Sequence, residues 1–343
     1  MSYNILIISL GYFIIMRKDL LNFIWLPSFL VSFLFIKIYI PDYRRLDDLS
    51  YFNKGKYAFN SFINDFPNLS EVIFWSDGIH IGYYLYNGLL TELLSFNYDD
   101  ITYLNCCLIA LVLPKLKAYV PKSFIIPLYF SPIIFSFPIF LNVKDSLLLV
   151  LTIIFLEQIK KQNGVGRNAC LIVVVIAMFS MRFYLPFLLI LWISMSHILI
   201  KGKINGMWLM LFLGVVVIIE MILPTQFSKI YTINASAVVD IIKMFVAPLP
   251  WNLGDEYDFL IFYSVFVFLR FPFIIIGVLL ILTRSSVRTK ELLLFCVICA
   301  MFLGSFPSLS GERQRLFFEP FLSLIGTIGF IGVLKGFARN SRY

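Results

Sequence analysis

The sequence predicts an all-α fold: a polytopic helical bundle of about eleven transmembrane helices that form a single integral membrane domain, residues 1–343. Of the 343 residues, 60% are hydrophobic and 14% are charged, and the mean hydropathy is +0.89. A soluble domain carries about 25% charged residues. Apolar runs of roughly 15–23 residues recur as far as the C-terminus, close to the length that crosses a hydrocarbon core of ~30 Å.

Eleven apolar stretches are the predicted spans. In chain order they are 3–16, 20–40, 101–114, 122–142, 146–158, 168–181, 184–200, 206–223, 259–283, 291–307 and 316–334. Two longer segments, 41–100 and 224–258, interrupt the series. Within the first, 79–96 contains several tyrosines with Asn87 and Glu92, a composition that favours an interfacial or re-entrant helix over a spanning one.

Basic residues lie in short clusters between these stretches, and the richest clusters fall on alternate connections. The positive-inside rule places that side in the cytoplasm. The clusters are Arg17 with Lys18, Lys115 with Lys117, Lys160 with Lys161 and Arg167, Lys201 with Lys203, Arg284 with Arg288 and Lys290, and Lys335 with Arg339 and Arg342. Both long segments then lie on the outer face. If 79–96 crossed the membrane, the charge pattern would invert, which argues against such a crossing.

Several classes of function are not supported by the sequence. The net charge of +8 is spread over many clusters rather than gathered in one patch, so no nucleic-acid partner is indicated. No Gly-rich phosphate loop or Rossmann fingerprint occurs, which argues against chemistry on soluble nucleotide sugars. The five cysteines lie in apolar runs without the spacing of a metal site, so we interpret them as packing residues and expect no metal and no cofactor.

A cationic set falls on the predicted outer face, against the usual charge bias of outer loops. Its members are Lys144, Arg182, Arg313 and Arg315. Guanidinium groups at a membrane are costly unless an anion meets them, and their forks bind phosphate through two hydrogen bonds. We therefore expect this set to bind an anionic group, such as the diphosphate of a lipid carrier.

The alternative is that interior carboxylates pair with these arginines. It applies to Arg182 and to Arg270, which lies well inside a predicted span. The available carboxylates are Asp145, Glu220 and Glu319.

The first outer segment begins with a mixture of acids and arginines. These are Asp42, Arg44, Arg45, Asp47 and Asp48. The acids could serve as a general base towards a sugar hydroxyl, hold a metal, or belong to a solvated loop. Adjacent residues point in different directions on a helix, so at most one of Asp47 and Asp48 faces a site. In the second outer segment, Trp251 follows a Pro-Leu-Pro turn and serves either to stack on a sugar or to anchor the chain at headgroup level.

The order of several motifs resembles a known family. The motifs are an acidic, Tyr-bearing segment at 42–57, Ser76-Asp-Gly-Ile-His-Ile-Gly-Tyr-Tyr-Leu-Tyr-Asn-Gly-Leu-Leu90, a Lys144-Asp145 corner that opens a helix, Arg182-Phe-Tyr-Leu-Pro186, Pro248-Leu-Pro-Trp251 and Glu312-Arg-Gln-Arg-Leu-Phe-Phe-Glu-Pro320. Over most of its length the chain resembles bacterial Wzy-type O-antigen and capsule repeat-unit polymerases, including the EpsG-like branch.

The resemblance implies a multi-pass glycosyltransferase of the bacterial inner membrane whose active site faces the periplasm. Such an enzyme polymerises undecaprenyl-diphosphate-linked repeat units into the O-antigen of lipopolysaccharide or into capsule. Its partners would be these lipid-linked glycans, the lipid bilayer, a flippase and a chain-length regulator. By position, Arg182, Arg313 and Arg315 would form the binding set.

Two other functions fit parts of the sequence. A GT-C type polyprenyl-phosphate-sugar transferase shares the same broad architecture and would place a carboxylate and a metal on the first outer segment, where Asp42, Asp47 and Asp48 occur. A lipid-linked glycan flippase or transporter would need polar residues through the membrane midplane and an internal repeat. Mid-span charge occurs here at Arg270, and the sequence has no evident repeat.

Overall fold

The computed structural model describes residues 3–16, 20–39, 46–64, 81–182, 184–200, 261–304 and 312–340, together with Ile242 and Phe245. Over these residues all regular secondary structure is helical, with thirteen α-helices and no strand. The predicted all-α fold is therefore confirmed. By packing, the chain divides into two compact units: unit 1 is Met1–Leu116 with Ile134–Phe183, and unit 2 is Lys117–Ile133 with Tyr184–Tyr343.

Unit 1 contains the N-terminal helices and a later helical pair. Its helices are α1 (Tyr3–Met16), α2 (Leu20–Tyr39), α3 (Leu46–Asn64), α5 (Ile81–Leu94), α6 (Tyr98–Val112), most of α8 (Pro132–Phe140), α9 (Lys144–Lys160) and α10 (Val165–Met181). Aromatic side chains build part of its core. The Phe29 ring stacks on Trp25 at 4.6 Å between centroids and lies 6.0 Å from Tyr103.

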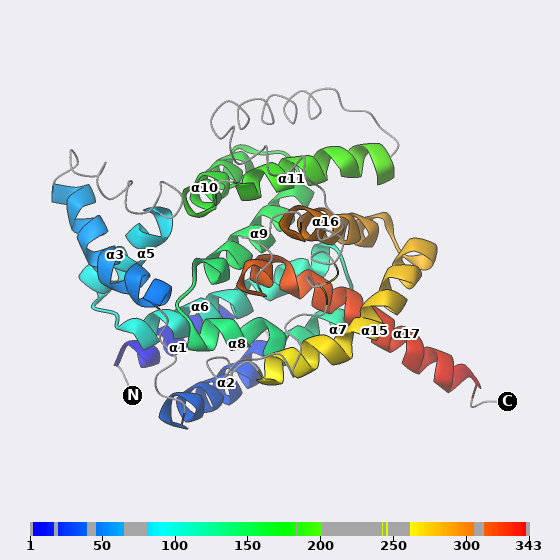
Figure 1. The fold of residues 1–343 in the computed structure, drawn as a ribbon, viewed down its shortest axis with the longest axis horizontal. Helices are drawn as coiled ribbons and strands as arrows, with labels where there is room; N and C mark the ends of the chain where they lie inside the picture. The colour runs from blue at the N-terminus through cyan, green and yellow to red at the C-terminus, as the bar shows by residue number, and fades with distance from the viewer. Residues whose placement is uncertain are drawn as a thin grey trace. The chain divides into compact units, whose positions relative to one another are not determined.

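α3 and α5 pack side by side at small residues (Figure 1). A Cβ atom added to Gly88 would lie 2.1 Å from the carbonyl oxygen of Gly55, so only glycine allows this approach. α5 also meets α10 closely, since a Cβ atom on Gly82 would lie 2.0 Å from the Ser180 hydroxyl oxygen. These contacts bring α3, α5 and α10 together around the buried polar residues of unit 1.

Unit 2 contains the C-terminal helices and a short insertion from the middle of the chain. Its elements are α7 (Lys122–Ile125), the 3-10 helix η3 (Ile126–Phe130), α11 (Tyr184–Met195), the π-helical turn η4 (Ser196–Ile200), α15 (Ile261–Arg284), α16 (Val287–Gly304), the 3-10 helix η8 (Glu312–Phe318) and α17 (Glu319–Asn340). α15 and α17 also pack through glycines. A Cβ on Gly277 would lie 2.0 Å from the Ile325 carbonyl oxygen, and one on Gly329 would lie 1.9 Å from that of Phe273.

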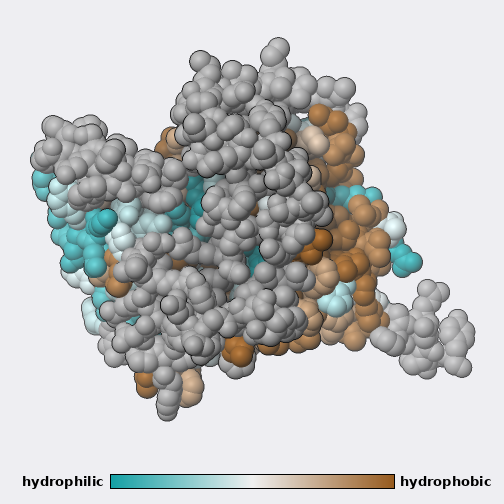
Figure 2. Space-filling view, viewed as in Figure 1, coloured by the Kyte–Doolittle hydropathy of each residue, from teal (hydrophilic) through white to brown (hydrophobic). Residues whose placement is uncertain are grey.

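Several described helices are long and apolar enough to cross a membrane. They are Tyr98–Ala118, which joins α6 to the 3-10 helix η2 (Leu113–Ala118), Tyr263–Arg284 and Arg315–Lys335, with a fourth if the bent pair Lys122–Phe130 and Pro132–Phe140 is one span. In the apolar part of Tyr263–Arg284, 22% of the residues are buried inside the protein. Figure 2 shows hydrophobic surface over α15 and hydrophilic surface over α3. These features fit a multi-pass membrane protein.

Ten of the eleven predicted apolar stretches coincide with helices, and the remaining one, 206–223, lies outside the described residues. The stretch 79–96 forms α5, a helix of 14 residues, and its interfacial or re-entrant placement stays a prediction. Four of the cysteines (Cys106, Cys107, Cys296 and Cys299) are buried, Cys170 is half-buried, and all five are free thiols. The burial of these four agrees with their predicted role in packing.

Candidate functional site

Arg182 forms a buried ion pair with Asp145 in unit 1. Its Nε donates to Asp145 Oδ1 at 2.9 Å, its Nη2 lies 2.8 Å from the same oxygen, and the Arg182 side chain is 4% exposed. α10 ends at Met181, and the extended backbone of Arg182 directs the chain away while its N–H still donates to the Met178 carbonyl. The predicted helix break at Arg182 is confirmed, and so is the alternative that an interior carboxylate pairs with this arginine.

Lys144 is the residue before Asp145, and the two open α9, which carries Asp145 in its first turn. A carboxylate in that position is stabilised by the positive end of the helix dipole. The Lys144 side chain is buried, and its Nζ lies 5.8 Å from the centroid of the Tyr51 ring. We call Lys144, Asp145 and Arg182 the Asp145 centre. The structure brings together two of the predicted binding residues at this centre.

α3 reaches the Asp145 centre through Tyr51, which stands edge-on to Tyr83 of α5 at 5.2 Å between ring centroids. Asp47 and Asp48 belong to the first turn of α3. They precede Tyr51 by about one helical turn, the separation at which residues share a helix face. The predicted catalytic acids therefore occupy the helix that contacts Lys144, although their side chains lie outside the described part of the chain.

A network of amide and phenol groups holds the segment that leads into α9. Tyr83 donates to the Asn142 side chain at 2.6 Å, and the Asn142 amide donates to Asn87 at 2.6 Å. The Asn142 backbone N–H donates to the Tyr98 hydroxyl at 2.9 Å. Because buried polar groups are costly when unsatisfied, these bonds fix the segment two residues before Lys144.

Two arginines share one carboxylate in unit 2. Arg315 Nε lies 2.9 Å from Glu319 Oε2, and Arg270 Nη1 donates to Glu319 Oε1 and, at 2.8 Å, to Ser323. Arg315 Nη2 also donates to the Tyr263 hydroxyl. The Arg315 side chain is 1% exposed and the Arg270 side chain 10% exposed. We call Arg270, Arg315 and Glu319 the Glu319 centre.

The Glu319 centre retains hydrogen-bonding capacity. Nε and Nη2 of Arg270 are buried and have no hydrogen-bond acceptor among the described residues. Guanidinium nitrogens are donors only, and a planar fork of such donors matches the oxygens of a phosphate or carboxylate. The predicted Arg270–Glu319 pairing is confirmed, and the centre also has the donors that an anionic ligand would need.

The remaining predicted site residues are only partly described. Arg313 belongs to η8, but its side chain lies outside the described residues. Four predicted residues lie entirely outside them: Asp42, Arg44, Arg45 and Trp251. Of the predicted cationic set, Lys144 and Arg182 belong to unit 1 and Arg315 to unit 2. The grouping of all its members on one face stays a prediction.

Sequence reasoning did not single out Tyr51, Asn142, Tyr263 or Ser323. A usable signal existed for Ser323, since Arg315, Glu319 and Ser323 are spaced four residues apart, as side chains on one helix face are. Asn142 interrupts an apolar run two residues before Lys144. For Tyr51 and Tyr263 there was no local signal, because their partners are distant in the sequence.

The Asp145 centre has one arginine paired with a buried carboxylate, with the buried Lys144 adjacent in the chain, and the Glu319 centre has two arginines at one buried carboxylate. Comparisons of the chain with protein-family models, with curated proteins and with solved structures give no match. Function is therefore inferred from these two centres and from the sequence patterns. Buried ionisable groups within apolar helices pair with one another or mark a functional site.

Proposed function

We propose that the chain is a membrane glycosyltransferase that polymerises undecaprenyl-diphosphate-linked oligosaccharide repeat units into O-antigen or capsule. It would cross the bacterial inner membrane about eleven times, with a broadly GT-C-like architecture and its active site facing the periplasm. The motif order that resembles Wzy-type polymerases supports this proposal. So does the alternation of basic loops, which assigns the segments near both centres to the outer face.

One observation carries the proposal: two guanidinium groups meet a single carboxylate at the Glu319 centre, and two buried nitrogens of Arg270 have no acceptor among the described residues. In apolar surroundings a surplus of cationic donors favours an incoming anion. The diphosphate of a lipid carrier is an anion that reaches this depth of a membrane protein. Its oxygens suit a guanidinium fork.

The chemistry assigned to this centre is stabilisation of the leaving group. In the transfer, the bond between the anomeric carbon and the diphosphate oxygen breaks as the acceptor hydroxyl oxygen attacks. Negative charge then grows on the departing undecaprenyl diphosphate. Guanidinium groups already in position stabilise that charge without reorganisation in the transition state.

The Asp145 centre supplies a second cationic position, and α3, whose Tyr51 contacts Lys144, carries Asp47 and Asp48 in its first turn. We assign Arg182 and Lys144 to an anionic group of the second lipid-linked unit. One of Asp47 and Asp48, or Asp42, would accept the proton that the acceptor hydroxyl loses. Tyr51 links α3 to Lys144, which favours the first two acids.

The experiment replaces Arg270 with glutamine in cells that carry the pathway, and analyses the surface glycan on gels. Arg315 and Glu319 remain a neutral pair in this variant, so the protein should accumulate normally. We expect single repeat units in place of long ladders. The matched control is Arg284→Gln at the exposed end of α15, which should keep the ladders. Long ladders from an Arg270→Gln protein would contradict the proposal.

A second candidate is a metal-dependent polyprenyl-phosphate-sugar transferase. The observation that favours it is the position of Asp47 and Asp48 in the first turn of α3, one turn before the residue that contacts Lys144. The two functions are separated by measuring the activity of the unaltered chain, and of its Asp47→Asn and Asp48→Asn variants, with and without a chelator. Loss of activity in the chelator supports the metal-dependent transferase, whereas insensitivity to it supports the polymerase.

A further inference from the structure

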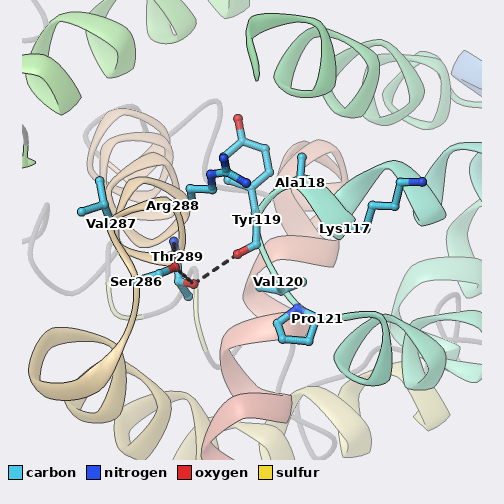
Figure 3. A pocket seen from close by; sticks show the side chains of 9 residues that line it. All are labelled: Lys117, Ala118, Tyr119, Val120, Pro121, Ser286, Val287, Arg288 and Thr289. Carbon is cyan, nitrogen blue, oxygen red and sulfur yellow. Dashed lines mark hydrogen bonds between the residues drawn. The ribbon is translucent and has the colours of Figure 1, made fainter. Parts of the chain in front are cut away.

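Unit 2 contains an open pocket of about 480 Å³ (Figure 3), and its lining does not include the residues of the Glu319 centre. It lies between the turn after η2 and the first turn of α16. Its lining comes from residues 117–121 and 286–289. Two of them are basic and none is acidic.

One hydrogen bond joins the two walls of this pocket, and a second lies within one wall. Thr289 Oγ1 donates to the Tyr119 carbonyl oxygen at 3.2 Å across 170 residues of sequence, and Ser286 Oγ lies 3.1 Å from Thr289 Oγ1. Figure 3 shows both bonds between the drawn side chains. Thr289 and Tyr119 are both buried, so the bond between the walls is shielded from water.

The pocket lies where two candidate spans end. Tyr98–Ala118 ends at a lining residue, and Tyr263–Arg284 ends two residues before Ser286. The pattern of basic loops assigns both of these connections to the cytoplasmic side, and their adjacency in unit 2 agrees with that assignment. The pocket therefore lies at the depth of the lipid headgroups.

The charges of the pocket suit an anion. Arg288 and Lys117 are both exposed, and Figure 3 shows the Arg288 guanidinium beside the Tyr119 ring, whereas the Lys117 side chain extends away from the other residues drawn. Burial raises the pKa of the Tyr119 phenol, and the nearby Glu291 carboxylate raises it further, although Arg288 acts in the opposite direction. The phenol thus stays neutral and adds no negative charge.

We propose that this pocket binds the phosphate of an anionic phospholipid in the cytoplasmic leaflet. Basic pockets between helices at that face recognise such headgroups, and each basic side chain contributes to the attraction. Arg288 supplies a fork for the phosphate oxygens, and Lys117 supplies a mobile charge at the rim. The start of α16 adds the positive end of a helix dipole. This site is independent of the proposed transferase function.

The test uses the purified full chain in vesicles of phosphatidylcholine with a minor fraction of phosphatidylglycerol. Native mass spectrometry then measures how much phosphatidylglycerol stays bound. The double variant Lys117→Gln, Arg288→Gln should retain at least about fivefold less phosphatidylglycerol than the unaltered chain. Both side chains are exposed, so the thermal unfolding midpoint should not change.

The matched control is the Arg284→Gln, Lys335→Gln double variant, which removes the same charge from exposed positions that do not line the pocket. Equal loss of lipid in both double variants would overturn the proposal, because it would show a general attraction to the surface. Excess inorganic phosphate should fail to displace the lipid. Displacement by phosphate would assign the pocket to a free anion and overturn the headgroup proposal.

Discussion

Arg182 and Asp145 meet through a single carboxylate oxygen, which lies 2.9 Å from the arginine Nε and 2.8 Å from its Nη2. The pair joins the end of α10 to the start of α9, and Lys144 lies next to it in the chain. The pair therefore stabilises the fold of unit 1 and also keeps basic groups in its interior.

Removal of the carboxylate should destabilise the protein. Asp145→Asn would leave the Arg182 guanidinium buried without its partner charge, and breaking a buried pair in this way costs about 3–5 kcal/mol. Thermal unfolding in detergent measures the loss. The matched control is Asp99→Asn, which breaks the more exposed Lys37–Asp99 pair and should cost about 0–1 kcal/mol. Equal midpoints for the two variants would contradict the stabilising role of Asp145.

A charge exchange separates folding from function at the same pair. The double variant Asp145→Arg, Arg182→Asp restores an ion pair, so it should accumulate better than Asp145→Asn alone. Polymerisation should still be absent, because the guanidinium no longer lies at position 182. Gels of the surface glycan and immunoblots of the protein measure the two effects. Long ladders from the exchanged protein would show that the pair acts only in folding.

Lys144 should matter to activity more than to stability. Lys144→Met keeps the aliphatic stem that packs beside Tyr51 but removes the charge. We expect a folded protein whose polymerising activity falls about 10²-fold, the effect of removing one group that stabilises charge in a transition state. Tyr51→Phe keeps the ring and should retain activity. Normal ladders from Lys144→Met would remove this residue from the binding set.

The contact between α15 and α17 should tolerate no side chain at Gly329. A Cβ there would lie 1.9 Å from the Phe273 carbonyl oxygen, a backbone atom that cannot move away cheaply. Gly329→Ala should lower the free energy of unfolding by about 1–3 kcal/mol. The control is Gly11→Ala, where no atom lies within 4 Å of the added Cβ and the helix should be unchanged or slightly more stable. A thermal unfolding midpoint for Gly329→Ala above that of Gly11→Ala would refute the close packing of α15 and α17.

Local sequence patterns predicted the helices well. The apolar run 3–16 coincides with α1, and the break at Arg182 separates α10 from α11 as expected. Length and composition decide whether a segment is helical, and both can be read from neighbouring residues. The helix at 79–96 was also expected, because its polar content distinguished it from a spanning segment.

The partners within the two centres could not be read from the sequence in the same way. Asp145 and Arg182 are 37 residues apart, and Arg270 and Glu319 are 49 apart. Which carboxylate meets which guanidinium depends on how the helices pack, and that packing is set by close contacts such as Gly277 against Ile325. The sequence offered three carboxylates for these arginines without distinguishing among them.

The most direct measurement of the central claim is the affinity of the purified chain for undecaprenyl diphosphate in nanodiscs. The Arg270→Gln variant keeps the neutral Arg315–Glu319 pair but loses the buried donors that have no acceptor among the described residues. We predict binding at least about tenfold weaker than that of the unaltered chain, as expected for lost hydrogen bonds to a charged group. Arg284→Gln should bind as the unaltered chain does. Equal affinity of the Arg270→Gln protein and the unaltered chain would contradict the assignment of the Glu319 centre to the lipid diphosphate.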